Sequence, residues 1–94
     1  MLTITLVPSP ACHFCEDADE ALADLARTFA FELETVPIES PRGARLVAQH
    51  RPALSPLVLV DGEYFSAGRL PRKKLTKLLT ARGALAPVRA EAAS

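Results

Sequence analysis

The sequence predicts an α/β protein whose four-stranded mixed sheet has helices on both faces. Three observations lead to this prediction. Segments with the spacing of strands and helices alternate in the order βαβ, then α, then ββα. Residues 57–60 (Leu-Val-Leu-Val) form a continuous apolar run, which is typical of a central strand buried on both faces. The dipeptide Asp61-Gly62 follows that run and is a strong hairpin signal.

The first strand and the first helix are predicted near the start of the chain. Residues 2–7 alternate aliphatic side chains with threonine, which favours a strand. Ser9 is a suitable helix cap, and Pro10 suits the first helical position. Apolar residues then recur at steps of three and four, so we expect a helix over about residues 12–29.

A second strand and a short helix follow. Residues 31–38 alternate in character and predict a strand near the sheet edge, because Pro37 cannot donate a ladder hydrogen bond. This strand should run parallel to the first, after a right-handed crossover. Ser40 and Pro41 form a cap and a first helical residue for a helix over about residues 42–50.

A hairpin and a third helix complete the predicted fold. The return strand after the Asp-Gly turn is expected over residues 63–67, and Gly68 ends it. Pro71 begins the third helix, in which leucines share one face and basic residues cover the rest. Gly83 is a natural C-terminal cap for this helix.

The composition is that of a small globular protein. Of its 94 residues, 49% are hydrophobic and 23% are charged. We therefore expect one domain over residues 1–83 and a frayed tail over residues 84–94. No apolar run approaches the roughly 20 residues of a membrane span. Eleven basic and eleven acidic residues cancel, which argues against nucleic acid as a partner.

The balanced charge hides a split along the chain. Residues 1–34 hold seven acidic residues and one basic residue, whereas residues 35–94 hold ten basic and four acidic residues. Two solvated faces of opposite sign would explain this split, and a charged docking surface is the alternative.

Cys12 and Cys15 are the only cysteines, and His13 and Phe14 separate them. A secreted disulfide-rich protein usually has four or more cysteines at wider spacing. The first residues also lack the basic and apolar regions of a signal peptide. We therefore expect a cytoplasmic protein in which a close cysteine pair performs redox chemistry.

The placement of the two cysteines predicts their roles. Residues three apart share one face of a helix, so the sulfurs can form a disulfide with little backbone movement. Cys12 should lie beside the unpaired N–H groups of the helix start, which favour its thiolate, although nearby carboxylates oppose this effect. Cys12 is then the attacking thiol and Cys15, deeper in the first turn, the resolving thiol. His13 either tunes Cys12 or faces solvent without a role.

Two other interpretations of the cysteine pair stay open. One is a metal or iron–sulfur carrier, but a zinc site needs four ligands and His13 and His50 are the only histidines. Two chains could share such a centre. In the redox interpretation we expect no bound metal or cofactor, because the dithiol–disulfide couple carries the electrons. The other is a binding module without turnover, in which Phe14 and Phe65 form a contact surface rather than core.

The sequence resembles the glutaredoxin-like branch of the thioredoxin superfamily, in particular small bacterial members with a Cys-His-x-Cys motif. The likeness rests on residues 12–18 (Cys-His-Phe-Cys-Glu-Asp-Ala) and 55–62 (Ser-Pro-Leu-Val-Leu-Val-Asp-Gly), and it extends to about Gly83. It implies a thioredoxin/glutaredoxin-like fold. It also implies a thiol–disulfide oxidoreductase that reduces protein disulfides or glutathione mixed disulfides.

The resemblance also implies the substrate-binding residues. Pro56 would be cis and face the cysteine pair, with the backbone of Ser55 pairing with a bound peptide or glutathione. His13 and Phe14 would lie beside the reacting sulfur, and Gly68 would keep the backbone turn where the family receives glutathione. A basic residue follows that turn in place of the family's acidic one. Glutathione and a thioredoxin-reductase-type donor are both candidate reductants.

Overall fold

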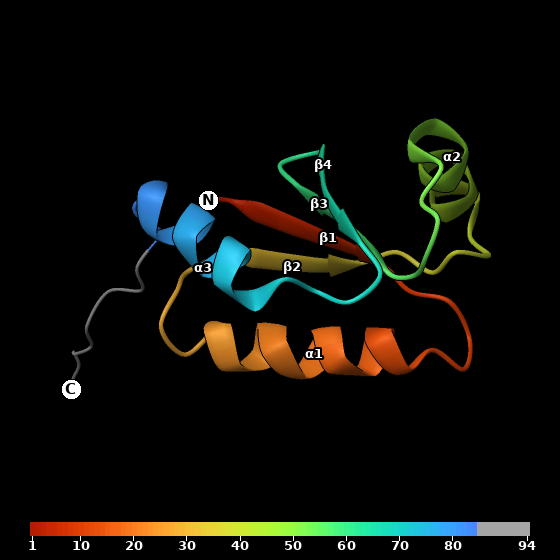
Figure 1. Cartoon of the computed structure of the whole chain (residues 1–94). Coiled ribbons are helices and arrows are strands. Elements are labelled where there is room, and N and C mark those ends of the chain that lie inside the picture. Colours follow the sequence, from red (N-terminus) through yellow and green to blue (C-terminus); the bar gives the residue numbers. More distant parts are fainter. Residues whose placement is uncertain (85–94) are drawn as a thin grey trace.

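Three helices cover the two faces of a four-stranded sheet in the computed structural model, which describes residues 1–84 (Figure 1). The elements are β1 (Thr3–Val7), α1 (His13–Leu25), β2 (Glu32–Thr35), α2 (Pro41–His50), β3 (Leu57–Val60), β4 (Glu63–Ala67) and α3 (Arg72–Ala81). The strand order is β2-β1-β3-β4. β1 and β2 are parallel, and β3 is antiparallel to both of its neighbours. The predicted element order and mixed sheet are thus confirmed.

Except for Ala84, the predicted tail lies outside the described residues. Among residues 1–84, no helix combines the length and the apolar character that a membrane crossing requires.

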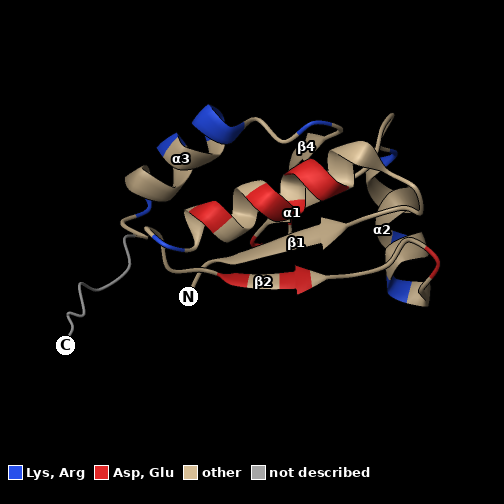
Figure 2. Ribbon diagram, turned by 90° about the horizontal axis from the view of Figure 1, so that it is seen from below, with Lys and Arg blue, Asp and Glu red and all other residues tan. Residues whose placement is uncertain are grey.

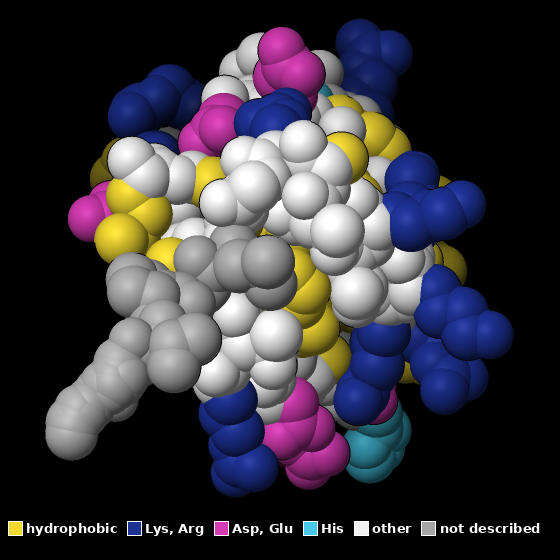
Figure 3. Space-filling model, turned by 90° about the vertical axis from the view of Figure 1, so that its left-hand side faces the viewer, with side chains coloured by type: hydrophobic (Ala, Val, Ile, Leu, Met, Phe, Trp, Pro, Cys, Tyr) yellow, Lys and Arg dark blue, Asp and Glu magenta, His cyan; other side chains and the backbone are white. Residues whose placement is uncertain are grey.

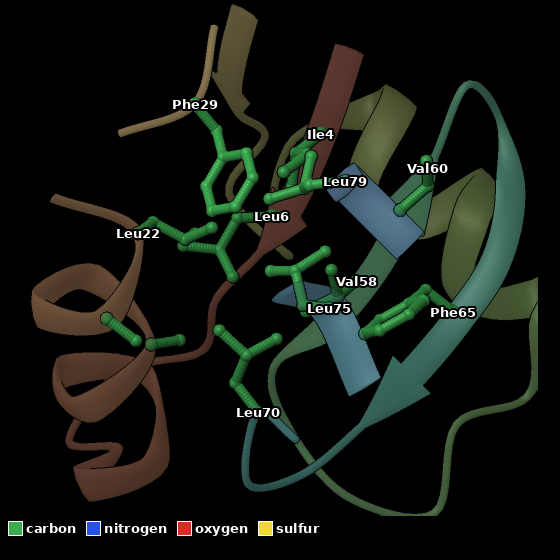
Figure 4. Packing of buried hydrophobic residues seen from close by; sticks show 12 residues of the cluster. Ile4, Leu6, Leu22, Phe29, Val58, Val60, Phe65, Leu70, Leu75 and Leu79 are labelled. Carbon is green, nitrogen blue, oxygen red and sulfur yellow. The ribbon is translucent and has the colours of Figure 1, made fainter. Parts of the chain in front are cut away.

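The larger part of the core lies between the sheet and the helices α1 and α3 (Figure 4). The sheet contributes aliphatic side chains from β1 and β3, and the two helices contribute Leu22, Leu75 and Leu79, each at most 1% exposed. Burial of one such side chain stabilises a fold by about 1.5–3 kcal/mol. This cluster also contains Phe65, so of its two interpretations the structure supports core rather than contact surface.

Among the described residues, α2 is the helix on the opposite face of the sheet. Its buried cluster is small and consists of Val7, Val36, Leu57 and Leu59. Three further apolar side chains, Ile38, Leu46 and Val47, pack against this cluster and are only partly buried. Helices on both faces were predicted and are confirmed, but the thinner cover on this face leaves apolar surface open near one end of the sheet.

The start of α1 differs from the prediction. The expected cap Ser9 and first helical residue Pro10 lie outside the helix, which begins at His13 with Cys12 as its N-cap. Ala11 has a positive φ of 51°, which interrupts any helical run from Pro10. The sulfur of Cys12 then accepts the backbone N–H of Cys15 and takes the capping role that the hydroxyl was expected to have.

The end of α1 is also earlier than predicted. The helix stops at Leu25, whereas the apolar spacing suggested residue 29. Phe29 still belongs to the core and its N–H still donates to the carbonyl of Leu25, at 2.8 Å. The side chain therefore continues the apolar stripe from a turn rather than from the helix.

β2 is shorter than the predicted strand over residues 31–38 but has the predicted edge position. Its regular pairing with β1 ends at Thr35. Val36 and Ile38 still donate to backbone carbonyls at the end of β1, at 2.8 and 3.1 Å. Pro37 lies between them, so its nitrogen faces the free edge of the sheet, where a missing N–H costs no ladder hydrogen bond.

The two shorter helices begin and end close to the predicted residues. α2 spans Pro41–His50 with Ser40 as its cap, as expected, and the hydroxyl of Ser40 accepts the N–H of Gly43 at 3.0 Å. Pro71 is the N-cap of α3 rather than its first residue. Gly83 follows this helix with a φ of 66°, so the predicted C-terminal glycine is confirmed.

The Asp61-Gly62 turn joins three elements. Both residues have a positive φ, 50° and 84°, as the tight hairpin turn requires. The carboxylate of Asp61 accepts the N–H of Thr3 at 2.9 Å and pairs with Arg82 at 3.2 Å. The predicted hairpin is confirmed, and its aspartate also ties β1 to the end of α3.

Many of the acidic and basic residues lie on two neighbouring helices, α1 and α3 (Figure 2). Acidic residues occupy the outer side of α1, and basic residues occupy that of α3. Asp17 and Arg72 join the two helices through an ion pair of 2.9 Å. Most of the Lys and Arg side chains seen from the end of the molecule gather on one flank (Figure 3).

A cluster of three polar side chains, Thr5, Glu34 and Arg42, links β2 to β1 and α2 and should make the stability of the fold depend on pH. Arg42 donates to both carboxylate oxygens of Glu34, at 2.8 and 2.9 Å, and the hydroxyl of Thr5 donates to one of them. These bonds, first that from Arg42 and then that from Thr5, hold the pKa of Glu34 below its ordinary value. The carboxylate therefore stabilises the fold above the ordinary pKa of glutamate, and this effect is lost as the pH falls through the lowered value.

We accordingly expect Glu34→Gln to lower the urea midpoint of unfolding at about pH 7 and to have little effect at about pH 2. Glu32→Gln on the same strand is the matched control, because its exposed carboxylate has no side-chain partner among residues 1–84. An equal loss at both pH values would show that the ion pair is not the cause.

Candidate functional site

Cys12 and Cys15 form a disulfide at the start of α1. Their Cα atoms lie 5.2 Å apart, and the N–H of Cys15 lies 3.1 Å from the sulfur of Cys12. Cys12 is partly exposed, whereas Cys15 is 6% exposed and lies on the inner side of the helix. The predicted proximity of the two sulfurs and the deeper position of Cys15 are confirmed.

The local chain path explains why the pair lies at the helix start. β1 delivers the chain to one end of the sheet, and residues 8–11 turn it back over the face that α1 covers (Figure 1). Cys12 has extended backbone angles, φ −118° and ψ 109°, as an N-cap residue does, while its carbonyl already accepts the N–H of Glu16 at 3.2 Å. Its sulfur therefore faces the orphan N–H groups of the first turn, which carry a partial positive charge.

The segment before β3 lies next to the disulfide. The Ser55–Pro56 bond is cis, as the resemblance implied. The carbonyl oxygen of Ser55 lies 3.7 Å from the sulfur of Cys12. Pro56 itself is fully buried, and its carbonyl accepts the N–H of Gly68 at 3.1 Å. The carbonyl of Ser55 therefore lies next to the sulfur of Cys12, whereas Pro56 and Gly68 are buried.

A groove of about 550 Å³ opens beside Cys12. Three segments contribute its lining: the start of α1, the α2 side of the sheet, and the loop before β3. The lining residues are Ser9, Ala11, Cys12, His13, Phe14, Ile38, Val47, Pro52, Ala53, Leu54 and Ser55. Phe14 and Leu54 remain 42% and 57% exposed although both are large apolar residues.

In the structure, the seven predicted site residues fall into two groups, one that lines the groove and one that is buried. Cys12, His13, Phe14 and Ser55 line the groove directly. The remaining three, Cys15, Pro56 and Gly68, are buried and support the groove from beneath.

Sequence reasoning missed the apolar walls of the groove, namely Ile38, Val47 and Leu54. Ile38 and Val47 had been assigned to a strand and a helix, where an apolar residue is expected to be core. Leu54 gave the one usable signal, because a large apolar residue between Pro52 and Pro56 lies in a segment that cannot join the sheet ladder.

His13 points away from the protein. Its side chain is 99% exposed, and its Nδ1 atom lies 4.0 Å from a carboxylate oxygen of Glu16. An exposed pair at this distance is strongly screened by solvent and contributes little to stability. The imidazole is therefore available to a bound partner at the groove mouth.

The residues that the structure describes do not assemble a metal centre. Among residues 1–84, no group of three or more His, Cys, Asp or Glu side chains is placed to hold an ion. A centre built on Cys12 and Cys15 would need ligands from outside this set.

Comparisons with known proteins do not assign the chain to a family. No protein-family model matches it, and a search of curated proteins finds no significant match. The geometry around Cys12 therefore carries the functional argument.

Gly68 supports the wall of the groove, so a side chain at this position should lower the stability of the fold. A Cβ atom on Gly68 would lie 3.0 Å from Cδ1 and 3.1 Å from Cβ of Leu54, and the φ of Gly68 is 88°. Gly68→Ala should therefore lower the free energy of unfolding by more than the about 1 kcal/mol that a left-handed alanine costs.

Gly62→Ala is the matched control for this measurement. Gly62 has a similar φ of 84°, but an added Cβ there meets nothing within 4 Å. Urea unfolding of both variants separates the backbone cost from the contact with Leu54. Equal losses would show that Leu54 is free to move and that Gly68 does not fix the groove wall.

Proposed function

We propose that this protein is a thiol–disulfide oxidoreductase of the glutaredoxin-like type, which reduces disulfides through Cys12 and Cys15. The observation that carries the proposal is the placement of a partly exposed sulfur at the N-cap of α1, at the edge of an open groove and bonded to a buried partner. A permanent structural disulfide gains nothing from such exposure, whereas an attacking thiol requires it.

The arrangement of elements supports a thioredoxin-like fold. A parallel β1–α1–β2 unit is joined through α2 to an antiparallel β3–β4 hairpin and α3. α1 and α3 pack on one face of the sheet and α2 on the other. This likeness concerns architecture, and the functional proposal rests on the cysteines rather than on the fold.

The proposed reaction is a two-step exchange that balances within the dithiol. The Cys12 thiolate attacks one sulfur of a substrate disulfide, a mixed disulfide forms, and the other substrate sulfur leaves as a thiolate that takes up a proton. The Cys15 thiol then loses its proton and attacks Cys12, which releases the second substrate thiol. The substrate gains two electrons, and Cys12–Cys15 becomes the disulfide.

Several groups prepare Cys12 for the first step. The N–H of Cys15 is placed to donate to a Cys12 thiolate, and the other free N–H groups of the first turn add their partial charge. The Ser55 carbonyl lies where a protonated Cys12 thiol would donate. Glu16 in the same turn opposes the thiolate, but its carboxylate is well exposed and screened.

The proposed direction is reduction of the substrate in a reducing compartment such as the cytoplasm. Substrates are disulfide-containing proteins or glutathione mixed disulfides. Glutathione or a thioredoxin-reductase-type donor returns electrons to the Cys12–Cys15 disulfide. The dithiol itself carries the electrons, so the reaction needs no bound cofactor.

Single-cysteine variants test this function. With dithiothreitol as reductant, we expect the protein to accelerate insulin disulfide reduction and Cys12→Ser to be indistinguishable from the reaction without protein. Cys15→Ser keeps the attacking thiol but lacks the resolving one, so it should accumulate a mixed disulfide that mass spectrometry detects. Equal background rates for the wild type and Cys12→Ser would instead support a binding module without turnover.

A further inference from the structure

We propose that the groove beside Cys12 selects protein disulfides whose cysteine has an apolar neighbour, and that Leu54 sets this preference. The occupant is an extended, uncharged segment of a protein substrate rather than glutathione. This inference rests on the proposed function and names the substrate class of the same site.

The first argument is the exposure of apolar side chains at one place. The large hydrophobic residues exposed in the described part of the chain are Met1, Phe14, Leu33, Leu54 and Tyr64. Phe14 and Leu54 come from elements far apart in the sequence, yet both line the groove next to Cys12. Such exposure costs solvation free energy that a bound apolar side chain would recover.

The second argument is the absence of formal charge in the lining. No Lys, Arg, Asp or Glu is among the groove residues, and the ionisable His13 points into solvent. Glutathione carries carboxylates and an ammonium group, and each loses hydration on binding unless a partner replaces it. The lining offers no Lys, Arg, Asp or Glu side chain as such a partner, whereas an uncharged peptide segment needs none.

The third argument is an open stretch of backbone. Within residues 1–84, no hydrogen bond occupies the N–H of Leu54 or that of Ser55. An extended peptide can pair with these groups while its side chains enter the groove. The peptide would then present its disulfide to Cys12, which lies 3.7 Å from the Ser55 carbonyl.

Leu54 is the most exposed apolar side chain of the groove walls named above. It covers Gly68, which has no side chain to displace it, and keeps 57% of its surface exposed. Val47 and Ile38 form the apolar wall from the α2 side. A substrate side chain entering the groove therefore meets Leu54 as well as this wall, so the size and polarity of residue 54 should determine the substrate preference.

The test is a panel of short peptide disulfides that differ only in the residue beside the cysteine: leucine, serine or aspartate. Pre-reduced wild type reacts stoichiometrically with each peptide and with oxidised glutathione, so no added reductant is needed. Each rate constant is divided by that of a small free thiol with the same disulfide, which removes intrinsic reactivity. We expect the leucine peptide to react about 10–100-fold faster than the aspartate peptide and than oxidised glutathione.

Variants assign the preference to Leu54. Leu54→Ala should reduce the leucine-to-serine rate ratio by about 5–10-fold, and the near-isosteric Leu54→Met should restore it. Leu33→Ala is the matched control, because Leu33 is a similarly exposed leucine on β2, outside the groove lining. Far-UV circular dichroism confirms folding, and the wild-type panel decides the question if Leu54→Ala does not fold.

The outcomes separate the two proposals. Equal normalised rates across the panel, or fastest reaction with oxidised glutathione, would overturn the apolar preference and leave the redox function standing. An unchanged ratio in Leu54→Ala would reject Leu54 as its source. No exchange with any disulfide would overturn the redox function itself, and the substrate inference with it.

Discussion

The hydrogen bond from the Cys15 N–H to the sulfur of Cys12 is the interaction on which the structure of the site depends. It caps α1, and it places the sulfur where the helix concentrates partial positive charge. The left-handed Ala11 makes this arrangement accessible, because the chain turns before the helix begins. Local backbone geometry, rather than a charged side chain, thus positions the sulfur of Cys12.

The two faces of the sheet contribute differently to this site. The large cluster under α1 and α3 fixes the helix that carries both cysteines. The small cluster under α2 leaves Ile38 and Val47 partly open. The same difference in burial therefore provides a rigid support for Cys12 and an apolar groove next to it.

Much of the fold follows from short-range rules that the sequence displays. The β1 alternation, the apolar β3 run and the Asp61-Gly62 turn each specify their own local structure, and the structure agrees. The same holds for Cys12 and Cys15, because a three-residue spacing at a helix start brings the sulfurs together whatever the tertiary context.

The incorrect or missing predictions have two causes. Two residues compete for one helix-capping role, and other positions depend on packing between segments that are far apart in the sequence. Ser9 and Cys12 are both able to cap a helix, and sequence cannot rank them without the turn at Ala11. The spacing of Phe29 matches the apolar stripe of α1, but a residue in a turn can also occupy a core position. The sequence marks Leu54 as an apolar residue outside the sheet, but its place in the groove depends on the convergence of α1, α2 and the loop before β3, which no local pattern encodes.

The alkylation rate of Cys12 tests the central claim most directly. In Cys15→Ser, reaction with iodoacetamide at about pH 6.5 should be faster than in an unstructured peptide of residues 10–17 with the same serine. The helix start favours the thiolate only in the folded protein, whereas the neighbouring carboxylates are present in both. A folded protein that reacts no faster than the peptide would contradict the account.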